Sequence, residues 1–453
     1  MSNAPFFNLG ISSIGIISQQ SNFPSAIDGV PKYPWVANIK SLPFVLISNN
    51  PNDNPDYSDL QTAMNEVGSG IFYVRNTGTP YTFNTVYNTA SNQVVIFEAG
   101  TQINTTAINS TSIQVGFVIG YTSNGTPLNN IYWYGNGTIL TLPANSTAYG
   151  ILIFPASTSI VPTTGARNIV VDGFIINGNG STANAFSMNN NQSSTTQTPY
   201  IAQISNFIIR NMYIYNNHFS SFNISGSTTN GLIENVIIDN SSVPAGNDYS
   251  ALIMHSNVGT VNYLTFINVM VKANGSSGQV LEIQGSTASG AVTVTSHIRF
   301  IDCIFDTGAS SPVAAGSGGP YLDDNNGTAN SAYITNIDFI NCQWINAIIE
   351  YQSTTTHFGY IRFIGSQPQG FTGTLLGRSI GSNNTSISVG ASPFTYTNSY
   401  DFPIIVTVSG GAVTAITLDG VTTGAVAGAF LLLPNHTLQV TYTTAPTMTA
   451  ISV

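Results

Sequence analysis

A short apolar strand with an Asp or Asn near its centre recurs along this 453-residue chain and constrains its fold more than any other feature. Gaps of 39, 24, 33, 34 and 39 residues separate successive markers. A constant local pattern at variable spacing is typical of a coiled sheet whose turns carry loops of different length. We expect each strand to stack on its counterpart about 4.8 Å away. The markers should form a ladder at a sharp bend, where short amide side chains tolerate left-handed backbone. They are Asp172, Asn211, Asn235, Asn268, Asp302 and Asn341.

The segments on either side of the repeat follow other patterns. Residues 1–55 hold seven prolines without periodicity and indicate an irregular arm that attaches the chain to a larger particle. A helix should follow, because Ser58 and Gln61 fit a capping box. Its apolar stripe would be Leu60, Ala63, Met64 and Val67.

After about residue 373, alternating strands are separated by Gly410-Gly411 and Asp419-Gly420 turns, which predict a small antiparallel sandwich. We therefore expect three parts: an arm over 1–55, a coil with its helix over 56–372, and a sandwich over 373–453.

The helix near 59–67, the glycine-bounded strand after it and the strand over 93–100 resemble the start of right-handed parallel β-helix proteins of the pectin-lyase-like group. The resemblance covers about 58–372 and implies that the helix caps the open end of the coil. The stretches 393–398, 408–411 and 445–449 resemble a module that follows β-helices in tail-spike and fibre proteins of phages and archaeal viruses. The expected fold is all-β: a right-handed parallel β-helix with a short amino-terminal capping helix, followed by a small carboxy-terminal antiparallel β-sandwich.

The composition excludes several classes of protein. Only 6% of the residues are charged, against about 25% in an ordinary domain. The nine basic residues are scattered, so no patch for nucleic acid forms. The 42% hydrophobic content excludes disorder, and no apolar run reaches the roughly 18 residues of a membrane span. Neutral amides and hydroxyls keep a surface hydrated at any pH, which favours acidic surroundings. The alternative is that long β-rich fibres simply use Asn, Ser and Thr heavily.

Fourteen Asn-x-Ser/Thr sequences are candidate N-glycosylation sites. Each is a weak signal in a chain so rich in these residues, and together they are compatible with an exterior location. The first residues lack the basic and apolar regions of a secretion signal, so we expect unusual export or release inside a virus particle. The sites are Asn104, Asn109, Asn124, Asn136, Asn145, Asn179, Asn191, Asn223, Asn240, Asn274, Asn326, Asn383, Asn384 and Asn435.

The two cysteines, Cys303 and Cys342, hold the same place in successive repeats. Stacked turns would bring their Cα atoms about 5 Å apart, within disulfide range. A bridge would close a loop of about 40 residues and add about 4 kcal/mol; the alternative is a pair of free thiols in the core. Neither the cysteines nor the five histidines have metal-ligand spacing, so we expect no metal and no cofactor.

Some β-helix enzymes cleave polysaccharides with grouped carboxylates, and the polygalacturonase-type His and Arg-x-Lys partners are not matched here. Asp323 and Asp324 form the one adjacent acidic pair, in a stretch expected to be a polar loop. Glycosidases need two carboxylates about 5–9 Å apart, which a sequence cannot place, so no residue is assigned as catalytic. The other acids considered are Glu234, Asp239, Glu282, Asp338 and Glu350.

The resemblance, the low charge and the missing signal together imply a virion spike or tail fibre that attaches to host cells, from a virus of an acidic, archaeal habitat. The expected protein is a homotrimer that binds host surface glycans or pili and joins other virion proteins through its amino-terminal arm. One alternative is an archaeal cell-surface adhesin or filament subunit. Another is a polysaccharide-degrading β-helix enzyme.

Overall fold

The structure is a computed structural model. It describes residues 44–105, 115–154, 165–188, 204–244, 250–255, 260–275, 278–285, 292–313, 319–323, 331–352, 361–365, 385–398, 404–433 and 435–452. Two compact units are present, a parallel coil and a second unit that consists of Leu375–Val453 together with Tyr360–Ile364. The described residues contain no helix long and apolar enough to cross a membrane.

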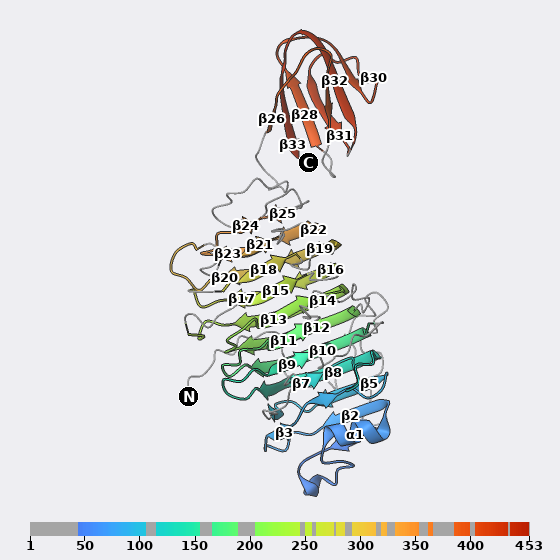
Figure 1. Cartoon of the computed structure of the whole chain (residues 1–453), viewed down its shortest axis with the longest axis vertical. Coiled ribbons are helices and arrows are strands. Elements are labelled where there is room, and N and C mark those ends of the chain that lie inside the picture. The colour runs from blue at the N-terminus through green and yellow to red at the C-terminus, as the bar shows by residue number, and fades with distance from the viewer. Residues whose placement is uncertain are drawn as a thin grey trace. The chain divides into compact units, whose positions relative to one another are not determined.

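Parallel strands stack turn upon turn to form the coil (Figure 1). The longer of its two sheets follows the order β1-β2-β5-β8-β10-β12-β14-β16-β19-β22-β25. Its register is regular: Ile169 of β10 lies opposite Phe207 of β12, which lies opposite Gly231 of β14. The bounds are β1 (Val45–Ile47), β2 (Gly70–Val74), β5 (Gln93–Phe97), β8 (Asn129–Thr141), β10 (Arg167–Asn177), β12 (Ile204–Tyr215), β14 (Thr228–Asp239), β16 (Thr260–Ile267), β19 (Val292–Ile301), β22 (Ser331–Ile340) and β25 (Ile361–Ile364).

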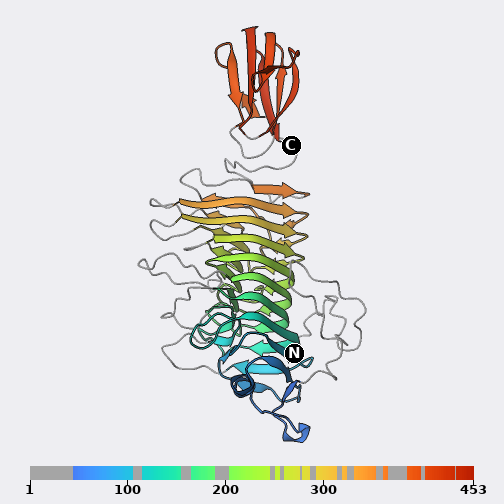
Figure 2. The same ribbon diagram turned by 90° about the vertical axis from the view of Figure 1, so that its right-hand side faces the viewer.

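Shorter strands continue the same turns on the other walls of the coil, and Figure 2 shows the stack from a second side. Five join the long sheet: β3 (Tyr81–Phe83), β6 (Gln102–Thr105), β17 (Met270–Lys272), β20 (Ile304–Asp306) and β23 (Gln343–Ile345). Nine form a second sheet: β4 (Val86–Tyr87), β7 (Val115–Val118), β9 (Tyr149–Leu152), β11 (Phe186–Met188), β13 (Phe222–Ser225), β15 (Leu252–His255), β18 (Leu281–Gln284), β21 (Tyr321–Asp323) and β24 (Glu350–Gln352). This is the right-handed parallel β-helix that the repeat predicts.

Two of the short strands correct the sequence interpretation. β11 and β21 lie inside segments, 181–203 and 306–332, where the sequence shows no strand pattern and favours long loops. A three-residue strand has no recognisable periodicity of its own, because its pairing comes from the turns above and below it.

The predicted Asx ladder lies where the chain bends between two walls of the coil. Five of the six markers have φ of 52–53°, and the Asn211 amide donates to Asp172 Oδ1 at 2.8 Å. Asn235 donates to Asn211, and Asn268 to Asn235, at 3.3 Å each. Asp172 itself is one residue early, because it lies opposite Arg210. Gly173, with φ of 78°, takes the bend in that turn.

A second bend column runs along the opposite end of the long strands, and the sequence interpretation missed it. Its members, which we call the second column, have φ between 54° and 61°. Amide hydrogen bonds of 2.7–3.4 Å join its first five members in series. The column consists of Asn92, Asn130, Asn168, Asn206, Asn230, Tyr263, His297 and Asn336.

The interior of the coil is packed with side chains that stack from turn to turn. Phe300 lies between Phe266 and Phe339, with ring centroids 4.6 Å and 4.8 Å apart and interplanar angles of 20° and 5°. Between Phe207 and the next turn, Gly231 is required because the Phe207 ring leaves no room for a Cβ. Register and core packing are therefore coupled along the whole coil.

The first turn is closed by helix α1 (Leu60–Val67) and the short 3-10 helix η2 (Pro51–Asp53). The N-cap is Asp59, whose carboxylate accepts from the Thr62 amide at 2.7 Å, and not Ser58 as the capping box predicted. Gln61 instead donates to Asn65 and Tyr87. The Asp59 carboxylate accepts directly from a first-turn amide, so the capping box between Ser58 and Gln61 does not form.

Burial along α1 follows the predicted stripe except at its end. Leu60, Ala63 and Met64 are fully buried, but Val67 is 41% exposed because the helix ends there.

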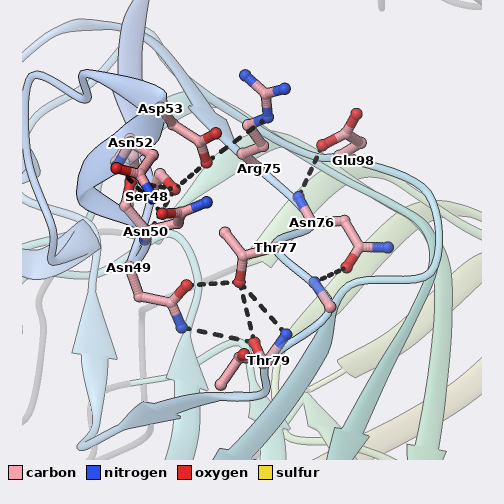
Figure 3. A network of polar contacts seen from close by, with 12 residues as sticks. Ser48, Asn49, Asn50, Asn52, Asp53, Arg75, Asn76, Thr77, Thr79 and Glu98 are labelled. Carbon is pink, nitrogen blue, oxygen red and sulfur yellow. Dashed lines mark hydrogen bonds and ion pairs between the residues drawn. The ribbon is translucent and has the colours of Figure 1, made fainter.

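A polar network ties η2 to the first turns of the coil (Figure 3). Ser48 donates to Asp53 at 2.5 Å, and Arg75 lies 3.7 Å from the same carboxylate. The backbone N–H of Asn76 donates to the Glu98 carboxylate at 2.7 Å. Phe44, the first described residue, packs against Tyr73 on the outer face of the long sheet, with ring centroids 5.7 Å apart.

The carboxy-terminal unit is the antiparallel sandwich expected from its turns. One sheet has the order β26-β33-β28-β31 and the other β27-β32-β29-β30. Their shared core includes Val406, Ile416 and Val440. The bounds are β26 (Thr385–Ile387), β27 (Phe394–Thr397), β28 (Ile404–Ser409), β29 (Ala412–Leu418), β30 (Val421–Thr422), β31 (Gly428–Leu432), β32 (Thr437–Thr444) and β33 (Thr447–Ser452).

Candidate functional site

The first candidate site is a row of charged residues on the outer side of the long sheet. Asp172, Arg210 and Glu234 are register partners on β10, β12 and β14. Arg210 Nε donates to Asp172 Oδ2 at 2.9 Å, and both side chains are largely buried. The alternation of strand side chains sends these residues outward while their neighbours fill the core.

Burial is the main cause of an altered acid strength in this row. It raises the pKa of Asp172 to about 7, and the negative charge of Glu234 acts in the same direction, while the hydrogen bond from Asn211 opposes it. Burial also lowers the pKa of Arg210. Two carboxylates and one guanidinium carry a net negative charge when all are ionised, so a buried row of this kind favours the uptake of one proton. The row therefore responds to pH.

The second candidate site is an acidic pair on the nine-stranded sheet, in which Glu282 is buried and Glu350 is half-buried. Tyr321 lies between Glu282 and Glu350 in register, on three consecutive turns. Two strand spacings place the two glutamates about 9–10 Å apart along the backbone. Asp323 occupies a neighbouring register position opposite Gln284, and Asp324 lies outside the described residues. Ser250 Oγ donates to Glu282 and to Gln279 Oε1, the latter at 2.6 Å.

This arrangement has a specific chemical meaning. Carboxylates separated by about 6.5–9.5 Å suit an inverting glycosidase, with a water between the base and the sugar. Glu282 and Glu350 approach that spacing along the backbone, as do Asp172 and Glu234 in the first site. Within the described ranges, no group of three or more His, Cys, Asp or Glu side chains could hold a metal ion.

The remaining acids have local roles. Asp239 accepts from the Ser241 amide at 3.0 Å, within a turn after β14. Asp338 lies 3.8 Å from Arg299 Nε on the neighbouring strand.

The candidate glycosylation sites differ in accessibility. Asn104, Asn124, Asn145 and Asn435 are exposed, and Asn136, Asn179 and Asn274 are half-buried. The side chains of Asn223 and Asn240 are buried inside the folded coil, so a glycan cannot be accommodated on either one in this fold. Asn109, Asn191, Asn326, Asn383 and Asn384 lie outside the described residues.

Cys303 and Cys342 are buried thiols on successive turns of the coil. Their sulfurs lie 3.7 Å from Phe266 O and 3.4 Å from Phe300 O. A hydrogen bond with Cys342, together with burial, raises the pKa of the Cys303 thiol, which makes it a poor nucleophile. A disulfide between them stays a prediction.

Comparison with known proteins identifies no family for the chain. No family model and no curated protein matches the chain. Among solved structures, an iota-carrageenase bound to iota-carrageenan fragments is 11% identical with a TM-score of 0.37, covering 66% of this chain and 87% of its own. Tailspike protein 4 of bacteriophage CBA120 is 8% identical with a TM-score of 0.34, and the match covers 86% of this chain and 64% of the tailspike chain. The Gp54 tailspike of Acinetobacter baumannii bacteriophage AP22, solved with a capsular saccharide, is 11% identical with a TM-score of 0.23. That match covers 87% of this chain and 94% of the tailspike chain.

Likeness at this level carries no argument about function. What defines the chain's class is its own strand pairing: a right-handed parallel β-helix followed by an antiparallel sandwich. A fold of this kind hosts unrelated functions, so function must be argued from surfaces.

Proposed function

We propose that the chain is a virion spike or tail fibre that attaches a virus to the host cell surface by binding glycans. The observation that carries the proposal is the combination of a long coil, held by backbone pairing and neutral amide ladders, with a separate sandwich unit after it. Such a coil is held mainly by backbone pairing and neutral side chains and depends little on surface ion pairs, so it suits a projecting part exposed to changing conditions.

An acidic habitat is part of the proposal, and an archaeal host follows from the resemblance in the sequence. Only 28 of the 453 residues are acidic or basic, the sum of 19 and 9. Burial raises the pKa of Asp172, so the protonated form of this carboxyl is favoured in the folded state. A chain with few charged residues changes its net charge little when its carboxylates become protonated, and Asp172 is protonated at low pH. Both features therefore favour stability in acid.

Self-association through the carboxy-terminal unit is also proposed, with a homotrimer as the assembly. Exposed large apolar side chains gather on and beside β30 and β31, which are edge strands of the two sheets. Residues 404–433 contain one charged residue, Asp419. An uncharged apolar edge is a site for pairing with another chain, and a second copy meets it without charge repulsion. The apolar residues are Val421, Val426, Leu431 and Leu433.

Leu431→Asp is expected to weaken this association at pH 7 by at least about tenfold, because it puts a charge on an edge strand that is apolar. The measurement is particle mass by light scattering during size-exclusion chromatography, where a trimer has three times the 47.9 kDa chain mass. Thr414→Asp adds the same charge at an exposed position of the other sheet and should leave the mass unchanged. Equal masses for wild type and Leu431→Asp would remove this edge from the proposal.

Attachment itself is tested by competition. Purified chain, added to host cells before virus, should lower virus adsorption in proportion to its concentration. Bovine serum albumin at the same concentration is the control. Undiminished adsorption at saturating chain would contradict an attachment role, and an adhesin or filament subunit of the cell surface would then be favoured.

A polysaccharide-degrading enzyme is the second candidate, favoured by the acidic pair Glu282 and Glu350 on the nine-stranded sheet. If the chain releases reducing ends from a host polysaccharide, Glu282→Gln and Glu350→Gln should each lower kcat at least a hundredfold, about the contribution of a general acid or base. Gln284→Ala, on the same strand as Glu282, is the matched control. The enzyme hypothesis fails if the wild-type chain releases none.

A further inference from the structure

The second column changes its chemistry at two consecutive turns. Asn92, Asn130, Asn168, Asn206 and Asn230 form its amide ladder. The next two positions are Tyr263 and His297, and the column then returns to asparagine.

Tyr263 holds a backbone conformation that does not suit it. Tyr263 and His297 both have φ of 54°. Asparagine and histidine are enriched several-fold in this left-handed region, whereas a bulky tyrosine there is an outlier. The substitution also ends the series of amide hydrogen bonds, since tyrosine carries no amide to continue it. Strained residues of this kind cluster at binding and active sites.

The aromatic pair lies on the surface, unlike the other stacked rings of the later turns. The rings of Tyr263 and His297 stack with centroids 4.6 Å apart and an interplanar angle of 24°. Tyr263 is 54% exposed, whereas Phe266, three residues later, is fully buried in the interior stack. The pair is therefore not core packing. It presents an aromatic surface to solvent.

Polar groups flank this surface. The Ser296 hydroxyl is buried and lies 3.1 Å from His297 Nδ1, so it holds the imidazole ring from below. Arg299 follows two residues after His297, within about 7 Å along the backbone, and its side chain is 64% exposed. An aromatic face beside a guanidinium donor matches a ligand with one apolar face and a rim of hydroxyls, because the face stacks while the rim accepts hydrogen bonds.

We propose that Tyr263 and His297 form a stacking subsite for a pyranose ring of a neutral surface polysaccharide. The inference rests on the proposed attachment function and assigns it a place, two turns of the coil where the amide ladder is replaced by rings. Ser296 positions the His297 ring, and the exposed Arg299 side chain donates to the sugar hydroxyls.

The test is affinity electrophoresis of the full chain in gels that contain yeast mannan, dextran, arabinogalactan or glycol chitin. At least one polymer is expected to retard the wild-type chain. Tyr263→Asn, which restores the residue type of the ladder and keeps the backbone conformation accessible, should raise the dissociation constant for that polymer at least about tenfold, equivalent to about 1.4 kcal/mol.

Two matched variants separate ring stacking from the ladder. Tyr263→Phe keeps the ring and should bind within about threefold of wild type. Asn230→Ala removes the side-chain hydrogen bond to Asn206 (3.4 Å) but keeps both rings, and should also retain binding. Circular dichroism and thermal unfolding show that each variant is folded, and Tyr263→Asn is expected to be at least as stable as wild type.

Three results would overturn the subsite: equal retardation of wild type and Tyr263→Asn, loss of binding in Asn230→Ala to the same degree, or no retardation of wild type by any of the four polymers. The attachment function fails separately. It is contradicted by undiminished virus adsorption in the competition assay, which does not depend on Tyr263.

Discussion

Phe300→Ala is expected to lower the free energy of unfolding of the coil by about 3–5 kcal/mol. Phe300 is fully buried and its ring is stacked on both sides, by Phe266 and Phe339. It also meets the edge of Phe305, with centroids 5.6 Å apart at 74°. Backbone pairing on both sides fixes the strand spacing, so the cavity left by the ring cannot collapse. The loss should therefore lie near the upper part of the range for buried aromatics.

Urea denaturation followed by circular dichroism measures this loss. Val67→Ala, at an exposed position in the same unit, is the control and should change stability by no more than about 0.5 kcal/mol. A loss below about 1 kcal/mol for Phe300→Ala would mean that the stacked interior does not carry the stability of the coil.

The second large effect is on pH dependence. Burial raises the pKa of Asp172 in the folded chain to about 7, from 3.8 for a solvent-exposed aspartate. Because the folded state holds the proton more tightly than the unfolded state, the stabilisation is fully present below about pH 3.8. It is lost as pH rises through about 7. The shift corresponds to at most about 4 kcal/mol between these limits.

Burial and the charge of Glu234, the next residue in the row, raise the pKa of Asp172. The hydrogen bonds from Arg210 and Asn211 favour the ionised carboxylate and oppose this shift, and Tyr134 lies opposite Asp172 on β8. Asp172→Asn removes the titrating group. Free energies of unfolding at pH 4, 5, 6, 7 and 8 should fall less steeply with pH in this variant than in wild type. Parallel curves for the two proteins would contradict the raised pKa and weaken the argument for an acidic habitat.

The sequence predicted the coil because its repeat is local. An Asx residue between apolar runs is visible within eight residues, and Asn211, Asn235 and Asn268 indeed bond to one another across turns. The sandwich was predicted for the same reason, since its Gly410-Gly411 and Asp419-Gly420 turns are short-range signals.

The candidate sites could not be predicted, because they depend on register between residues far apart in the chain. Glu282 and Glu350 share an outer face only through Tyr321, a strand residue in a segment expected to be a loop. Asp172 was interpreted as a bend residue, whereas the bend is at Gly173 and the carboxylate joins Arg210 instead.

The second column had one usable signal. Asn92, Asn130, Asn168 and Asn206 recur at a constant spacing of 38 residues, and this spacing could have revealed the ladder. Tyr263 and His297 break the pattern, and their place in the column is seen only in the backbone angles.

The central claim is that this chain projects from a virus particle and meets the host surface. Mass spectrometry of purified virions, combined with electron microscopy of particles labelled with antibody to the chain, tests it most directly. The chain is expected to be a structural protein of the virion, and the label is expected to decorate projecting spikes or fibres. Absence of the chain from virions, with label on the cell surface instead, would contradict it.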